Sequence, residues 1–128
     1  MQINDTKEDV VFVGSISLDY HIKLNREPKD IDITVTNLDG LSVFGKVEKF
    51  DTNSPFSILG KRAIIKREDY NIDVFIEKEL PEFVINNNIK YETLNNKIAH
   101  YNRVINSTED KYFLEYSKSM LNFIKERI

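Results

Sequence analysis

The sequence contains no cysteine among its 128 residues. This absence excludes disulfide bonds, zinc sites with thiolate ligands and a thiol nucleophile. No apolar stretch approaches the roughly 20 residues that a membrane-spanning helix needs. The polar, acidic start at residues 1–9 has neither the basic residues nor the apolar run of a signal peptide. From these absences we expect a soluble, cytoplasmic protein without a membrane segment.

The chain also lacks an excess of positive charge. Its 18 lysines and arginines are outnumbered by 21 aspartates and glutamates, and the formal net charge is −3. General nucleic-acid binders carry a clear basic excess. Any contact with RNA or DNA is therefore expected to be small or locally basic.

The composition is sufficient for a hydrophobic core, since 41% of the residues are apolar and 11% are aromatic. The length is that of one ordinary domain, and we find no internal repeat, linker or break in composition. We interpret residues 1–128 as a single domain.

The first half of the chain predicts two strands around a helix. Residues 10–13 form a short apolar run that predicts a buried strand, and Ser15 can cap a helix over residues 16–24. Residues 25–28 break this helix, because the residue before a proline avoids the helical region. Residues 30–35 alternate polar and apolar, as in a half-buried strand. Residues 38–47 stay ambiguous because they contain two glycines, and residues 51–55 are expected to form a loop.

The second half predicts a strand pair and then two helices. The strands span residues 61–66 and 72–77, and the helices form a C-terminal pair within residues 92–128. The apolar stripes of these helices are most simply core packing. Their members are Leu94, Ile98, Tyr101 and Ile105, then Phe113, Tyr116, Met120, Phe123 and Ile124. Asp110, after Ser107, resembles an acidic helix cap. The fold class is therefore α+β (α/β-like), a small mixed β-sheet with helices packed on one side.

Three aspartates are the main candidates for chemistry. Asp30 and Asp32 share one face of a strand, roughly 6 to 7 Å apart, and Ile31 and Ile33 anchor the opposite face. Asp73 lies between apolar neighbours on a later strand and would complete a three-carboxylate site if the two strands are adjacent. Carboxylate oxygens suit Mg²⁺. Exposed carboxylates on edge strands would give the same pattern.

Gly14-Ser15 lies at the junction between the first strand and the first helix. Glycine allows a close backbone approach, and a helix N-terminus with free N–H groups and a serine hydroxyl is a natural phosphate site. His21 and His100 lack the ligand spacing of a zinc site and are interpreted as surface or boundary residues.

This series of motifs resembles the DNA polymerase β superfamily of nucleotidyltransferases. The motifs are glycine-serine after a strand, a helix, Asp-x-Asp on the next strand, and a single aspartate on a later strand. Residues 13–35 are most similar to the head of the CCA-adding enzymes, including the Arg-x-Pro-x-Asp-Ile-Asp ending at residues 26–32. Residues 92–103 are similar to the lysine-bearing helix of abortive-infection nucleotidyltransferase-like toxins. Leu18-Asp19 departs from the Arg-Asp pair of the CCA-adding enzymes, so the substrate is not assigned from any one subfamily.

The resemblance implies a role for each matching residue. Asp30 and Asp32 would hold two Mg²⁺ ions, and Asp73 would share one and help to deprotonate the acceptor. Gly14 and Ser15 would bind nucleotide phosphate. Lys97 would reach phosphate or base, with a solvated helix lysine as the alternative, and Arg26 is a similar candidate.

The resemblance also implies a function, transfer of a nucleoside monophosphate from a nucleoside triphosphate to a hydroxyl. The acceptor is left open between an RNA end, a protein hydroxyl and a small molecule. The alternative is a catalytically inactive member of the fold that acts through a partner protein. A homodimer or protein partner is a further expectation, since the last helices carry more aromatic residues than a small sheet needs. These residues are Tyr112, Phe113, Tyr116 and Phe123.

Overall fold

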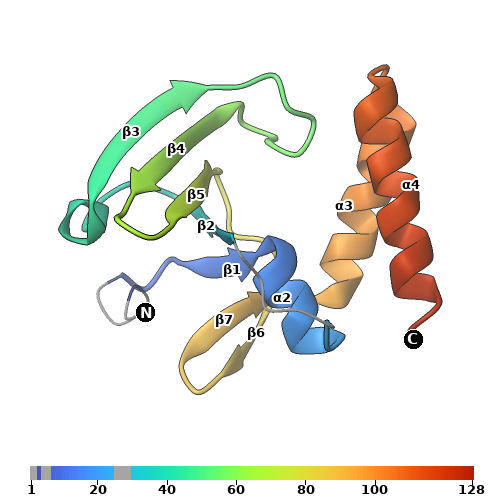
Figure 1. Cartoon of the computed structure of the whole chain (residues 1–128), viewed down its shortest axis with the longest axis horizontal. Coiled ribbons are helices and arrows are strands. Elements are labelled where there is room, and N and C mark those ends of the chain that lie inside the picture. The colour runs from blue at the N-terminus through green and yellow to red at the C-terminus, as the bar shows by residue number, and fades with distance from the viewer. Residues whose placement is uncertain (1–2, 4–6, 25–29) are drawn as a thin grey trace.

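The fold is a seven-stranded mixed β-sheet with two C-terminal helices that stand beside it as a packed pair (Figure 1). The computed structural model describes residue 3, residues 7–24 and residues 30–128. The strands are β1 (Val11–Val13), β2 (Ile31–Val35), β3 (Lys46–Asp51), β4 (Lys61–Lys66), β5 (Asn71–Ile76), β6 (Phe83–Asn86) and β7 (Ile89–Glu92). The helices are α2 (Gly14–His21), α3 (Leu94–Ser107) and α4 (Lys111–Lys125), with a short 3₁₀ helix, η1 (Leu41–Phe44). The expected helix break at residues 25–28, and Arg26 within it, lie outside the described residues.

The strand order is β3-β4-β5-β2-β1-β7-β6. β2 runs parallel to β5 and antiparallel to β1, while β4 runs antiparallel to both β3 and β5. The hairpin of β6 and β7 joins through a parallel contact between β7 and β1. The expected α+β class with a mixed sheet is confirmed.

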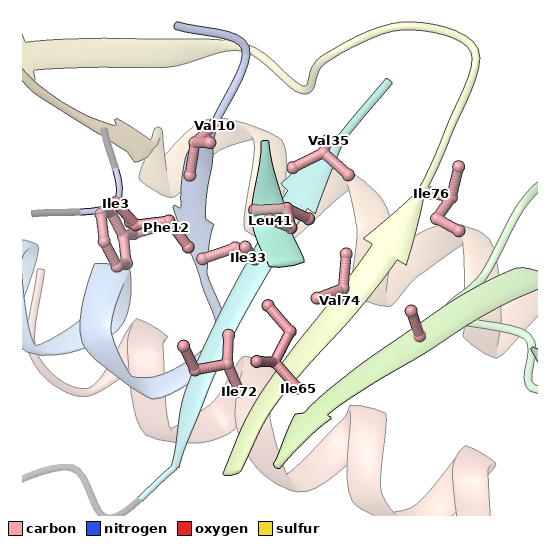
Figure 2. Close-up of a cluster of buried hydrophobic side chains, with 11 residues drawn as sticks. Ile3, Val10, Phe12, Ile33, Val35, Leu41, Ile65, Ile72, Val74 and Ile76 are labelled. Carbon is pink, nitrogen blue, oxygen red and sulfur yellow. The ribbon is translucent and has the colours of Figure 1, made fainter. Parts of the chain in front are cut away.

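One face of the sheet carries the larger core. In β5, Ile72, Val74 and Ile76 are buried, whereas Asp73 and Phe75 on the opposite face are only half-buried. Leu41 of η1 packs over this apolar face together with side chains of the neighbouring strands (Figure 2). Each fully buried Val, Leu or Ile stabilises the fold by about 1.5–3 kcal/mol.

The helices form a second core of their own. Leu18 and Ile22 near the end of α2 cluster with Tyr101 of α3 and with Leu121 and Ile124 of α4. α2 packs against β1, β2 and β7, whereas α3 and α4 pack chiefly against each other. The helix pair therefore rises beside the sheet instead of lying flat across it (Figure 1).

Capping residues fix the ends of the helix pair. The Thr93 hydroxyl accepts a hydrogen bond from the Asn96 N–H at the start of α3, at 3.1 Å. The Asp110 carboxylate accepts from the N–H groups of Tyr112 and Phe113 at the start of α4. The predicted helix pair is confirmed, and Asp110 is its N-cap.

Three strands were not expected from the sequence. The ambiguous region contains η1 followed by β3, and residues 83–92 form the hairpin of β6 and β7. Asn87 and Asn88 make its two-residue turn with φ of 52° and 65°, the left-handed backbone that such a turn requires. The first helix is shorter than predicted, because α2 ends at His21. No helix in the described part of the chain is long and apolar enough to cross a membrane.

Candidate functional site

Asp32 and Asp73 are direct neighbours on the two central parallel strands. The register of β2 and β5 pairs Asp32 with Asp73, so both side chains leave the sheet on the same face. Asp30 lies just before β2 and is exposed. The structure therefore brings two of the three candidate carboxylates side by side and leaves Asp30 at their edge.

The electrostatics of this group converge on Asp32. Burial, and then the negative charges of Asp73 and Asp30, raise the pKa of Asp32 to about 6, while Arg62 opposes the shift. A hydrogen bond to Asp73 also favours the protonated form of Asp32. A cation beside Asp32 would favour the ionised carboxylate and lower this pKa.

Gly14 is the residue closest to the Asp32 carboxylate from the direction of α2. Its φ is +64°, and a Cβ built on Gly14 would overlap Oδ2 of Asp32. Only glycine fits this contact between the start of a helix and a carboxylate. Ser15 follows in the first turn of α2, where Val13, the N-cap residue, makes no side-chain capping bond. The first N–H groups of α2 are thus available beside Asp32.

Lys97 holds the same glycine from the opposite side. Its Nζ donates to the Gly14 carbonyl at 2.9 Å and pairs with Glu92 Oε1 at 3.2 Å. The Lys97 side chain is 4% exposed and the Glu92 side chain 9%. Burial lowers the pKa of Lys97, and Glu92 opposes this shift. The alternative interpretation of Lys97 as a solvated helix lysine is therefore wrong. Lys97 of α3 is buried and bonds both Glu92 of β7 and the Gly14 carbonyl.

A cleft of about 920 Å³ opens between this face of the sheet and the helix pair. Ligand sites in proteins typically measure about 300–1,000 Å³. The sheet contributes Asp32, Thr34, Arg62 and Phe75 to its lining, the turn before α2 contributes Gly14, and the helices contribute Lys97, His100, Tyr101, Arg103, Tyr112, Phe113 and Tyr116. The candidate residues Gly14, Asp32 and Lys97 thus line one cavity.

Aromatic side chains form the helical wall of the cleft. Phe56 lies at the centre, with ring centroids 5.3 Å from His100, 6.1 Å from Tyr101, 5.7 Å from Phe113 and 5.8 Å from Tyr116. Much of the aromatic excess noticed in the sequence therefore lines the cleft. The expected protein partner at this helix pair stays a prediction.

Two of these side chains interact electrostatically with Asp32. Burial raises the pKa of Tyr101 and of Tyr116, and the negative charge of Asp32 contributes to both shifts. Both hydroxyl groups therefore lie within electrostatic reach of Asp32. Burial also lowers the pKa of His100 to about 4, which keeps its imidazole neutral at physiological pH.

The loop at residues 52–60 closes one end of the cleft. Arg103 donates to the Pro55 carbonyl at 2.7 Å, which ties this loop to α3. Both oxygens of the Glu77 carboxylate accept backbone N–H groups, from Ile58 at 2.9 Å and Leu59 at 2.7 Å. Glu77, which follows β5 and lies on the cleft, therefore has both carboxylate oxygens bound to this loop.

Arg62 on β4 is a charged cleft residue that the sequence analysis did not identify. Its guanidinium lies over the Phe75 ring at 4.4 Å from the centroid, and its terminal nitrogen lies 3.8 Å from Asp73 Oδ1. Its Nε is buried and has no hydrogen-bond partner among the described residues. No sequence motif marks Arg62, because its place depends on how β4 pairs with β5.

Within residues 3, 7–24 and 30–128, no group of three or more His, Cys, Asp or Glu side chains is arranged to hold a metal ion. Asp32 and Asp73 are a pair of adjacent carboxylates on the central strands. Comparison of the chain with protein-family models, with curated protein sequences and with solved structures gives no match.

Proposed function

We propose that this protein is a nucleotidyltransferase, which moves a nucleoside monophosphate from a nucleoside triphosphate to a hydroxyl acceptor. One observation carries the proposal: Gly14, at the start of α2, and Asp32 are in close contact and line the same ligand-sized cleft. Asp73 is the direct neighbour of Asp32 on the adjacent strand. Helix N-termini bind phosphate, and paired carboxylates recruit the cation that neutralises it.

The donor set fits magnesium. Mg²⁺ is usually bound through one or two carboxylates together with substrate phosphates, and keeps several waters. Asp32 and Asp73 supply two adjacent carboxylates, and Asp30 supplies a third within electrostatic reach of Asp32. When bound, two Mg²⁺ ions would neutralise charge on the transferring phosphoryl group and align the attacking and leaving oxygens.

The remaining steps belong to residues of the chain. The N–H groups at Gly14 and Ser15 would bind the β- and γ-phosphates. The acceptor oxygen forms a bond to the α-phosphorus as the bond to the bridging oxygen breaks, and pyrophosphate leaves. Asp73 would take the proton of the acceptor hydroxyl and pass it to solvent. The aromatic wall around Phe56 gives a planar base a surface on which to stack.

Lys97 enters this proposal as a positioning residue. Its bond to the Gly14 carbonyl fixes the turn whose N–H groups would hold phosphate. Because its Nζ is occupied by Gly14 and Glu92, its contribution to nucleotide binding would pass through that turn.

A second candidate is a catalytically inactive protein of the same architecture that binds nucleotide and acts through a partner. The lack of a three-carboxylate metal group among the described residues favours it. Such a protein would bind nucleotide without transferring it.

A transfer screen separates the two candidates. The purified protein is incubated with Mg²⁺ and each of four α-³²P-labelled nucleoside triphosphates. The acceptors are 3′-hydroxyl RNA, a cell extract depleted of small molecules, and a pool of small metabolites. The proposal predicts label on one acceptor class, lost in Asp32→Asn. Nucleotide binding with Mg²⁺ but no labelled product from any acceptor would favour the inactive protein.

A further inference from the structure

Arg62 has hydrogen-bonding capacity that the described residues do not satisfy. Its nearest carboxylate oxygen, Asp73 Oδ1, lies at 3.8 Å, beyond hydrogen-bond distance, and its buried Nε has no partner. The guanidinium is held by ring faces, at 4.4 Å from Phe75 and 5.7 Å from Phe50. Stacking occupies the face of a guanidinium and leaves its N–H edge free to bind.

An ion pair formed only to neutralise Asp73 would differ from this arrangement. Arginine and carboxylate in a settled pair adopt short, bidentate contacts of about 2.7–2.9 Å. The long contact of Arg62, together with its place in the lining of the cleft, indicates a guanidinium whose terminal nitrogens are held in place for a ligand there.

The order of the strands shows on which side of Asp32 and Asp73 the Arg62 side chain lies. Arg62 on β4 is paired with Phe75 on β5, followed by β2 with Asp32 and β1, which leads into Gly14. Through the strand pairing Arg62 is in register with Val11, three residues before Gly14. With strands about 4.8 Å apart and about 3.3 Å per residue along a strand, Arg62 and the Gly14 turn are separated by about 17 Å, and the two carboxylates lie on the strands between them. Arg62 and the helix N-terminus thus flank the carboxylates from opposite sides.

In-line displacement requires the attacking and leaving oxygens to lie on opposite sides of the phosphorus. If the Gly14 turn binds the leaving phosphates, the acceptor approaches from the side of β5 and β4. A free guanidinium on that side suits an anionic acceptor, since arginine binds phosphate in a bidentate manner.

We propose that Arg62 binds a phosphate group of the acceptor, and that the acceptor is therefore a phosphate-bearing molecule. This inference rests on the proposed transferase function. A polynucleotide end and a phosphorylated small molecule offer the same phosphate chemistry. An acceptor without phosphate, such as an unmodified protein hydroxyl, would leave Arg62 unused.

The test compares wild type with Arg62→Gln and Arg62→Lys. Lys61→Gln is the matched control, because it removes the same charge from the adjacent position, where Lys61 pairs with Asp51 at 2.6 Å outside the cleft. The probes are a fluorescein-labelled 3′-hydroxyl RNA hexamer, ribose 5-phosphate, ribose, and a methylanthraniloyl nucleoside triphosphate with Mg²⁺. Thermal unfolding followed by circular dichroism establishes that each variant is folded. If Arg62→Gln does not fold, Arg62→Lys takes its place in the binding comparison.

We expect Arg62→Gln to weaken one phosphate-bearing acceptor probe by about 10- to 100-fold, the value of a charged hydrogen bond. Nucleoside triphosphate binding should change less than threefold, and Lys61→Gln should behave as wild type. Arg62→Lys should fall between the two. If RNA is the ligand, the slope of log affinity against log salt should drop by about 0.7 in Arg62→Gln.

The other outcomes are equally informative. The inference would be overturned if Lys61→Gln lost as much affinity for the acceptor probe as Arg62→Gln. It would also be overturned if Arg62→Gln lost triphosphate binding alone, or if wild type bound no phosphate-bearing acceptor probe. Arg62-dependent binding of ribose 5-phosphate or RNA by a wild-type protein that binds no Mg²⁺-nucleotide would overturn the proposed function, and would leave Arg62 as a phosphate site only.

Discussion

The Asp32→Asn variant is expected to be more stable than wild type when no divalent cation is present. In the folded protein the pKa of Asp32 rises from 3.8 to about 6, first because of burial and then because Asp73 and Asp30 lie nearby. Each unit is equivalent to about 1.4 kcal/mol, so the ionised Asp32 costs about 3 kcal/mol of folding free energy at pH 7.5. Asparagine keeps the size of the side chain and removes that cost.

The sign of the pH dependence follows from the direction of the shift. A carboxyl whose folded pKa is raised destabilises the fold fully above about pH 6, and not at all below its unfolded pKa of 3.8. The cost of the ionised Asp32 should therefore fall as the pH drops from 7.5 towards 4.5. His100, whose pKa is lowered to about 4 in the folded protein, destabilises wild type and variant alike over the same range, so the difference between the two proteins isolates Asp32. The advantage of Asp32→Asn should be largest at pH 7.5 and should shrink over the same range.

Urea unfolding in EDTA at pH 7.5 and pH 4.5 measures both effects. Glu115→Gln is the control, because it removes a negative charge from an exposed position on α4. An Asp32→Asn variant that is less stable than wild type at pH 7.5 would refute this reasoning. A gain that is equal at the two pH values, or that Glu115→Gln reproduces, would do the same.

Substitutions at Gly14 and Lys97 test the contacts that hold the site together. In urea unfolding, Gly14→Ala should destabilise the protein more than Gly40→Ala. Both glycines have positive φ, but a Cβ at Gly40 meets no atom within 4 Å, whereas a Cβ at Gly14 overlaps Asp32. Gly40→Ala therefore carries only the backbone strain of about 1–2 kcal/mol. Lys97→Met should cost about 3–5 kcal/mol, because it leaves Glu92 buried without its cation. The double variant Lys97→Met with Glu92→Gln should recover part of that loss, and a double variant as unstable as the sum of the single variants would contradict the buried pair.

Much of the framework could be predicted from the sequence, because local patterns determine it. The alternation over residues 30–35 and 72–77 marks β2 and β5, since one face of each strand is buried. The apolar stripes of α3 and α4 could be predicted for the same reason, and Asp110 marks the start of α4.

The missed strands carry weaker patterns. β3 lies at the sheet edge with mostly exposed or half-buried side chains, so its sequence shows no apolar alternation. The Asn87-Asn88 turn could have indicated the hairpin of β6 and β7, because asparagine tolerates the left-handed backbone.

Only part of the candidate site could be predicted from local patterns in the sequence. Gly14, Asp30, Asp32 and Asp73 belong to motifs that are visible along the chain. The surroundings of Arg62 and Lys97 depend on contacts between distant segments, namely the register of β4 with β5 and the return of α3 to the Gly14 turn. Sequence spacing does not encode these contacts, so neither the free guanidinium nor the buried lysine could be anticipated.

The central claim is that the carboxylates and the Gly14 turn bind a nucleoside triphosphate together with magnesium. Isothermal titration calorimetry with α,β-methylene nucleoside triphosphates, with and without Mg²⁺, tests it most directly. The account predicts magnesium-dependent binding of at least one nucleotide to wild type, and loss of that binding in a folded variant combining Asp30→Asn and Asp32→Asn. Binding that needs no magnesium, or that survives in the double variant, would contradict it.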